Sequence, residues 1–153
     1  MVLRERGSVE EIYPYWLQTK MSKEFDGMPW FARGNLDFLI RELYPKNSEL
    51  VLNSFYEYGI KLGNYLKIKT KNIEELSKFF QVIRISIPAR VFELEPFEDA
   101  SGKGYVMRYV SGISQEMTTC MAKYLQGIFS CFSTNTQSRM ASGGMVELEI
   151  RVT

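Results

Sequence analysis

Histidine is missing from this sequence, since none of its 153 residues is a histidine. The absence excludes, within the chain itself, a zinc site of the Cys/His type, a Ser-His-Asp triad and a histidine-ligated haem. Cysteine is scarce: the chain has Cys120 and Cys131 and no CxxC pair. On one helix this spacing would separate the two residues by about 16 Å, too far for a disulfide. We therefore expect both cysteines to be reduced, mostly buried small hydrophobes, which fits a cytoplasmic location.

An excess of charge of one sign is also absent. The formal net charge is +1 and no dense patch of lysine and arginine stands out, so the sequence does not predict a nucleic-acid-binding protein. No apolar run reaches the roughly 18 residues that a membrane span needs, and the charged start MVLRERGSVE predicts no targeting signal. The composition, 45% hydrophobic and 24% charged, predicts one globular domain over residues 1–153, with residues 1–30 as a helical extension.

Several stretches carry apolar residues at helical spacing. The first, NLDFLIRELY over residues 35–44, is expected to end at Pro45. Ser48 is the expected N-cap of a long, largely buried helix. Asn72 and Ser114 are the expected N-caps of two further helices, each with an apolar face.

Strand patterns occupy the rest of the chain. ARVFELEPFED and GYVMRYVSG, joined by the turn-rich DASGKG, predict one hairpin, and TNTQSRM and MVELEIRV, joined across ASGG, predict a second. In the last strand Val146, Leu148 and Ile150 alternate with Glu147 and Glu149, the pattern of an antiparallel strand with one buried face. The order helices, hairpin, helix, hairpin predicts an α+β class, with helices packed on a small antiparallel sheet made of two hairpins.

Three glycines lie inside the two most apolar helices: Gly59, Gly63 and Gly127. Glycine inside a helix costs about 1 kcal/mol relative to alanine, so a compensating role is expected. One interpretation is that the glycines let two helices approach closely. The other is that the missing side chains open a cavity for an apolar ligand, and both hold if a close crossing leaves a gap beside it.

Aromatic residues make up 14% of the chain, which also has 8 methionines. An ordinary core accounts for them. The alternative is an adaptable apolar pocket, because methionine fits irregular apolar ligands and tyrosine adds a polar tip to an apolar wall. The carboxylate pairs of the chain are typical of solvated faces, so no catalytic residue is predicted. The candidate pocket residues are Tyr56, Gly59, Gly63, Met117, Met121, Tyr124, Gly127 and Phe129.

Four stretches matter as an ordered set. They are RGNLDFLIREL (Arg33 to Leu43), FYEYGIKLGNYL with its Gly-x-x-x-Gly (Phe55 to Leu66), YLQGIFSCF (Tyr124 to Phe132) and SRMASGGMVELEIRV (Ser138 to Val152). In this order they resemble the 4-vinyl reductase domain, a small-molecule-binding module also called the hydrocarbon-binding domain. The resemblance implies the fold shared with the Bet3-like subunits of TRAPP vesicle-tethering complexes.

The terminal hairpin departs from that family. Many members carry hairpin cysteines associated with zinc, whereas here no cysteine follows Cys131 and residues such as Arg139, Met140, Glu147 or Leu148 stand in their place. We therefore predict no metal site. The stretch YVMRYVSG, followed by an apolar helix and a hairpin, also resembles the haem nitric-oxide-binding domains, which extends the fold expectation to ligand-binding domains of the NO-signalling type. Those domains need a proximal histidine, so no haem is implied here.

Three functions follow from these resemblances. The first is non-catalytic binding of a small hydrophobic ligand, with a sensory or regulatory role, in a homodimer. The second is a scaffold or interaction subunit with no exchangeable ligand. The third is an accessory to tetrapyrrole vinyl reduction, suggested by the family's name alone. No cofactor fingerprint such as GxGxxG after a strand is present, so we favour a protein that is not an enzyme and predict no cofactor beyond a hydrophobic small molecule.

Overall fold

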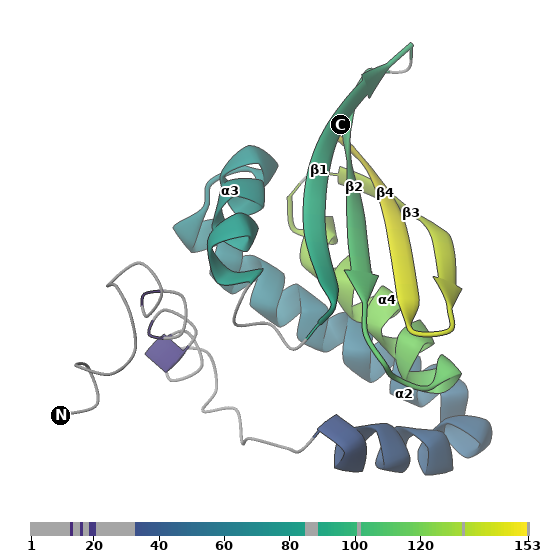
Figure 1. Cartoon of the computed structure of the whole chain (residues 1–153). Helices are drawn as coiled ribbons and strands as arrows, with labels where there is room; N and C mark the ends of the chain where they lie inside the picture. Colours follow the sequence, from purple (N-terminus) through teal and green to yellow (C-terminus); the bar gives the residue numbers. More distant parts are fainter. Residues whose placement is uncertain are drawn as a thin grey trace, which may run out of the picture.

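The computed structural model describes residues 33–84, 89–100, 102–132 and 134–152, together with 13, 16, 19 and 20. Most of the predicted extension over residues 1–30 therefore lies outside the described residues. The elements follow the order helices, hairpin, helix, hairpin, which confirms the α+β class (Figure 1). They are α2 (Arg33–Lys69), α3 (Ile73–Ile83), β1 (Val91–Asp99), β2 (Gly102–Val110), α4 (Gln115–Ser130), β3 (Thr134–Ser142) and β4 (Met145–Val152).

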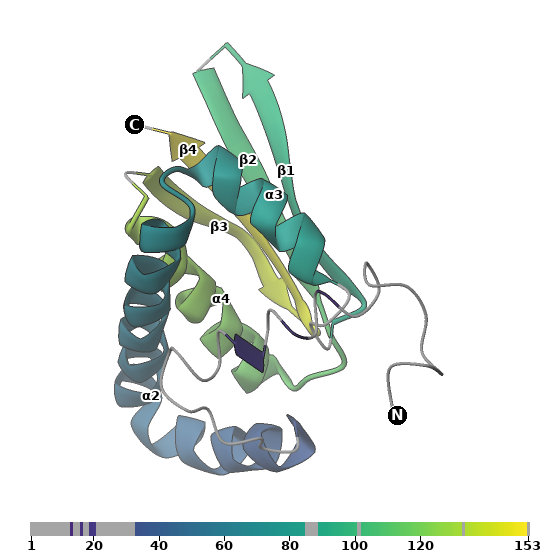
Figure 2. The ribbon, with the colours of Figure 1, turned by 90° about the vertical axis from the view of Figure 1, so that its left-hand side faces the viewer.

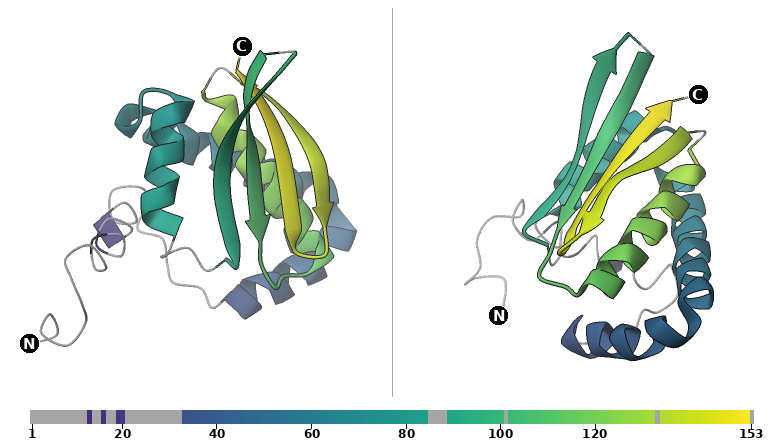
Figure 3. Two further views of the ribbon diagram at one scale, coloured as in Figure 1. Left: turned by 45° about the horizontal axis from the view of Figure 1, so that its top comes forward. Right: turned by 90° about the vertical axis from the view of Figure 1, so that its right-hand side faces the viewer.

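The two hairpins form a single antiparallel sheet in the order β1-β2-β4-β3. Val146, Leu148 and Ile150 are 0% exposed on the face that packs against helices, as their alternation predicts. Helices α3 and α4 cover this face, and α2 lies behind α4 on the side away from the sheet (Figure 3). The layers are therefore sheet, then α4, then the long part of α2.

Local sequence signals account for the helix and turn boundaries. The Asn72 side chain accepts a hydrogen bond from the Glu75 N–H at 2.9 Å, and Ser114 Oγ accepts one from the Met117 N–H at 3.2 Å, so both predicted N-caps are confirmed. Between β3 and β4 the chain turns at Gly143 and Gly144, whose φ angles are 58° and 79°. Glycine adopts such angles without steric cost, which explains the tight second hairpin.

Helix α2 is bent where two separate helices were predicted. It continues through Pro45 and breaks at Asn47, where φ is −147° and ψ is 48°. The predicted pair of helices is therefore confirmed, but the first helix runs past Pro45 and the break lies at Asn47, one residue before the predicted cap Ser48. Proline removes a helical hydrogen bond and crowds the preceding turn, and here the chain bends rather than stops. We call residues 33–46 the arm. Figure 2 shows that the arm is turned roughly across the start of α4.

The predicted close crossing of the glycine helices is confirmed. A Cβ atom added to Gly59 would lie 2.1 Å from the carbonyl oxygen of Tyr124, and one added to Gly127 would lie 2.2 Å from that of Tyr56. A Cβ on Gly63 would lie 2.6 Å from the carbonyl oxygen of Ile128. Helices α2 and α4 therefore meet backbone to backbone, at a separation that no residue larger than glycine permits.

Each edge strand of the sheet has an irregularity that breaks its regular pattern of hydrogen-bonding groups, but of a different kind. The outer strand β1 carries Pro96 together with acidic residues, among them Glu93, Glu95 and Glu98. In the other edge strand, β3, the register with β4 shifts between Ser138 and Met140, which is a β-bulge.

The crossing predicts that even a methyl group is destabilising there. At an exposed helix site Gly→Ala stabilises by up to about 1 kcal/mol. We expect Gly127→Ala instead to lose about 1–3 kcal/mol of unfolding free energy, because the added Cβ displaces the Tyr56 carbonyl, and the melting temperature to fall by several degrees. Gly127→Leu and Gly63→Leu should lose more in thermal unfolding measurements.

Asn64→Leu is the matched control, because Asn64 is exposed on the same helix beside Gly63. Its melting temperature should stay close to that of the wild type. A Gly127→Leu variant that melts with the wild type would show that the two helices do not touch at this point in solution.

Candidate functional site

The eight predicted pocket residues lie along the α2–α4 contact, but in three different surroundings. The glycines, with Tyr56 and Tyr124, form the crossing itself. Met117 and Met121 lie one to two turns closer to the start of α4. Phe129 is 0% exposed in the main core under the sheet. That these residues enclose a ligand pocket stays a prediction.

At the crossing, backbone atoms occupy the space beside the glycines. The tyrosine rings stand next to this contact: those of Tyr58 and Tyr124 stack with centroids 6.1 Å apart. Burial, and to a smaller extent the neighbouring Tyr58, raise the pKa of the Tyr124 hydroxyl, which therefore stays neutral. A ligand that uses the predicted residues must accordingly lie beside the crossing, where side chains rather than backbone meet.

Beside the crossing the structure has a second apolar cluster, separate from the main core. It lies between the arm of α2, the first turns of the helix after the bend, and the start of α4. Among the described residues, three of its members are buried: Ile40, Met117 and Cys120. We call it the elbow cluster; its half-buried members are Leu36, Tyr44, Val51, Leu52, Phe55, Ile113 and Met121.

A polar contact holds the arm against α4. Asp37 Oδ1 accepts a hydrogen bond from the Ser114 hydroxyl at 2.6 Å and another from the Ser114 N–H at 3.1 Å. Ser114 in turn caps α4, so one residue joins the arm to the helix start. The arm thus has two attachments, the bend at Asn47 and the Asp37–Ser114 contact.

Sequence reasoning found Met117 and Met121 but missed the arm residues of the elbow cluster. Leu36 and Ile40 were assigned to a helix of their own, and nothing in their spacing indicates that the helix folds back across α4. The signal that could have found them is the Pro45–Asn47 pair, which marks a bend as well as a helix end.

Neither cysteine has the features of a reactive thiol. Both are free, Cys120 fully buried in the elbow cluster and Cys131 half-buried at the end of α4. Burial, followed by the charge of Glu116, raises the pKa of Cys120 to about 11. Burial also raises the pKa of Cys131. The thiolate form is therefore scarce, and both residues serve as small hydrophobes, in agreement with the prediction.

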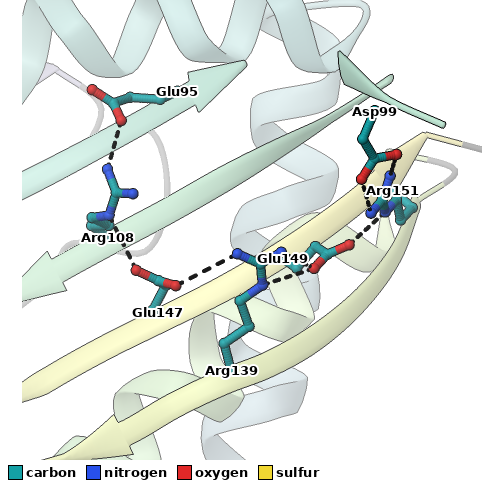
Figure 4. Close-up of polar contacts among 7 residues, drawn as sticks. All are labelled: Glu95, Asp99, Arg108, Arg139, Glu147, Glu149 and Arg151. Atoms are coloured by element: carbon teal, nitrogen blue, oxygen red, sulfur yellow. Dashed lines mark hydrogen bonds and ion pairs between the residues drawn. The ribbon is translucent and has the colours of Figure 1, made fainter. Parts of the chain in front are cut away.

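The helix-free face of the sheet carries a chain of ion pairs (Figure 4). Arg108 joins Glu95 at 2.6 Å to Glu147 at 3.1 Å across three strands. Arg139, the residue of the β3 bulge, continues the chain from Glu147 to Glu149.

The chain of pairs ends at the first hairpin. There Arg151 binds Glu149 at 2.5 Å and Asp99 through two hydrogen bonds of 2.7 Å, while its guanidinium lies 4.7 Å from the centroid of the Phe97 ring. Arg139, and then Arg151, lower the pKa of Glu149. Every carboxylate in this series has an arginine partner, so the face has the character of a solvated surface of ion pairs rather than of acid–base machinery.

Comparison with known proteins finds a solved structure of similar fold but assigns the chain to no family. No family model matches the sequence, and no curated protein matches it. Among solved structures, the fold is similar to that of an H-NOX protein from S. oneidensis in the Fe(II)NO ligation state, with a TM-score of 0.50. The similarity covers 91% of this chain and 89% of that chain at 13% sequence identity. It therefore establishes a likeness of fold, the one implied by the second resemblance in the sequence.

An iron group such as the one in that structure does not fit this chain. The chain has no histidine, and the described residues contain no group of three or more His, Cys, Asp and Glu that could hold a metal. The core around Phe80 of α3 is filled by aromatic rings: the Phe80 ring lies 4.9 Å from that of Phe92 and 6.4 Å from that of Phe129. In the described part of the chain, no helix is long and apolar enough to cross a membrane.

The side chains available as metal ligands predict whether the purified protein contains zinc or iron. We expect elemental analysis of the purified protein to find neither zinc nor iron at a stoichiometric level, since the chain lacks histidine and its thiols are held protonated. About one metal ion per chain would contradict this prediction.

The ion pairs on this face predict that part of the free energy of unfolding is lost in acid. The pKa of Glu149 is below its ordinary value of 4.5, so its carboxylate stabilises the fold above that pH, and this contribution is lost as the pH falls through the lowered pKa. Glu149→Gln should therefore melt below the wild type at neutral pH, and the two should converge in acid.

Glu57→Gln is the control, because Glu57 is exposed on α2 away from the sheet. It should follow the wild type over the whole pH range. A Glu149→Gln deficit that is the same at neutral and acid pH would mean that the carboxylate's charge is not what stabilises this face.

Proposed function

We propose that this chain is a non-catalytic sensory or regulatory domain that binds a small hydrophobic molecule at the elbow cluster and acts as a homodimer. The observation that carries the proposal is the division of the apolar interior. Most described members of the main core are buried, whereas the elbow cluster has three buried members among the described residues and is otherwise half-buried. Apolar surface left half-covered between two helices is where bundles accept small ligands.

The composition of the cluster suits an adaptable site. Met117 is buried and Met121 is half-buried on α4, facing Tyr44 and Phe55 of α2 within the same cluster. Unbranched methionine side chains change shape at little cost, so they can pack against an inserted apolar molecule. Met121 also packs against the main core, which would let an occupied elbow affect the packing of α4 under the sheet.

The arm provides a way to transmit binding. It pivots at Asn47, where helical geometry is already broken, and is held by the Asp37–Ser114 contact. A molecule inserted between the arm and α4 would favour an arm position with that contact lengthened, by its differential affinity for the two states. The outer side of the arm carries exposed apolar residues, so arm position and dimer surface would be linked.

The likenesses to known proteins support a ligand-binding role. The H-NOX protein of similar fold was solved in the Fe(II)NO ligation state. The four stretches that resemble the 4-vinyl reductase domain point to a small-molecule module as well, and we propose membership of that family on their order. Since an iron group does not fit, the proposed ligand is an organic, metal-free molecule.

A direct test combines native mass spectrometry with methyl NMR. We expect a co-purified small molecule, or, in its absence, saturable changes in the labelled methyl signals of Met117 and Met121 when naphthalene is added. Met121→Phe should weaken naphthalene binding because the larger ring fills the elbow. The control Met145→Phe alters a methionine that is 40% exposed on β4 and should bind naphthalene like the wild type.

Two results would contradict this proposal. Naphthalene that leaves Met117 and Met121 unchanged, with no co-purified molecule, would favour a scaffold with a permanently filled interior. A bound tetrapyrrole would instead support a role in vinyl reduction.

The scaffold is the second candidate function, and one observation favours it. Exposed apolar side chains gather on α2, where Phe38 is 60% exposed, Leu39 48%, Leu43 49% and Leu50 67%. A surface of this kind is typical of a protein–protein contact. This surface could form a dimer contact whether or not a ligand is bound, so both candidate functions predict a dimer.

Sedimentation of the purified chain should show a dimer at micromolar concentration. Leu43→Glu should shift it toward the monomer, because the charge would be buried in the contact. Ile68→Glu is the matched control at the far end of α2, where Ile68 is 81% exposed. A wild type that sediments only as a 17.8 kDa species would exclude the dimer.

A further inference from the structure

A groove lies at the other end of the molecule from the elbow cluster, between α3 and the outer half of the β1–β2 hairpin (Figure 1). Its volume is about 640 Å³, within the range of small-molecule sites. Helix α3 contributes one stripe of polar residues spaced three or four apart, including Glu74, Ser77 and Lys78. The hairpin contributes the opposite wall, including Lys103 and Tyr105 of β2.

The two lysines stand on opposite walls and act on the same carboxylate. Lys78 Nζ donates a hydrogen bond to Glu74 Oε1 at 2.7 Å. The pKa of Glu74 is lowered by Lys78 first and, to a smaller extent, by Lys103. Glu74 therefore shows how an anion sits in this groove, within the field of ammonium groups from both walls.

The Glu74–Lys78 pair is displaceable. Its side chains are 67% and 71% exposed, and an exposed pair one helical turn apart is held weakly because solvent screens it. The ordinary pKa of a lysine is 10.5, so the Lys78 side chain keeps its charge at neutral pH when Glu74 swings out to solvent. The carboxylate of a ligand could then take the place of the Glu74 carboxylate.

The apolar part of the groove lies next to the charged part. Tyr105 packs its half-buried ring against the main core, and burial raises the pKa of its hydroxyl, which remains a neutral hydrogen-bond donor. Pro96 of β1, the register partner of Tyr105, continues this wall.

We propose that this groove is a binding site for a small organic carboxylate, held by Lys78 and Lys103 with its apolar body against Tyr105. Three hydrogen-bond donors of the lining are available to a carboxylate, namely the two ammonium groups and the neutral Tyr105 hydroxyl, and the two glutamates already face lysines. Glu74 binds Lys78, and Glu98 lies directly opposite Lys103 in the hairpin register. The site is separate from the elbow cluster, so the two proposals stand or fall independently.

The test is an NMR titration of the full chain with 3-phenylpropionate at millimolar concentration. We expect saturable shifts in α3 and in the tips of β1 and β2, and Lys78→Met and Lys103→Met should each weaken binding about tenfold, the effect of losing one hydrogen bond to a charged group. Lys61→Met, which removes an exposed lysine on α2, is the matched control and should leave the affinity unchanged.

Two compounds that resemble 3-phenylpropionate in shape but not in charge test whether the carboxylate is what the groove binds. The alcohol 3-phenylpropan-1-ol should bind more weakly than the acid, and the amine 3-phenylpropylamine should not compete with it. Equal binding of acid and alcohol, preferential binding of the amine, or shifts that fall outside the groove would each overturn the proposal. So would lysine variants that keep the wild-type melting temperature and the wild-type affinity.

Discussion

The backbone contact between α2 and α4 is the constraint on which the arrangement of the other elements depends. Helix α4 alone separates α2 from the sheet (Figure 3). Because the two helices touch at Gly59 and Gly127, the apolar residues that follow on α2 reach past α4 into the main core, where Leu66 is 1% exposed. A wider separation would withdraw these side chains from the core and leave a void that costs both burial and packing energy. The glycines lower the stability of their own helices, but the close crossing that they permit lets the three layers pack together.

The same contact also determines where the packing becomes looser. A straight helix that is in backbone contact at one end of α4 cannot follow the helix to its other end at the same distance. The chain bends at Asn47, and the arm returns across the start of α4 with its own small cluster of apolar side chains. The close crossing and the half-buried elbow are therefore two consequences of one geometry.

The features that were predictable from the sequence are the local ones. The caps at Asn72 and Ser114, the two hairpins and the alternation around Leu148 each depend on a few consecutive residues, and all are confirmed. The crossing was also predictable, because glycine weakens an apolar helix unless close packing against a neighbour compensates for it. The bend was not, because Pro45 indicates equally a stop and a kink, and the outcome depends on what the arm can pack against.

The groove between α3 and the hairpin was hidden for a related reason. Glu74, Lys78 and their neighbours have the pattern of a solvated helix face, and only the position of the β1–β2 hairpin turns that face into a wall. The likeness to an H-NOX protein shows how far a scaffold and its chemistry can diverge, since this chain has the fold without a histidine to bind iron.

The edges of the sheet restrict how copies of this domain can associate. Strand pairing between molecules needs an edge with regular, unhindered N–H and C=O groups. Strand β1 lacks one N–H at Pro96 and presents carboxylates on both sides of it, and β3 is out of step with its partner at Arg139. Neither edge is therefore a good template for another strand. Both edges of the sheet therefore resist pairing with a strand of another molecule, which protects the domain from ordered aggregation.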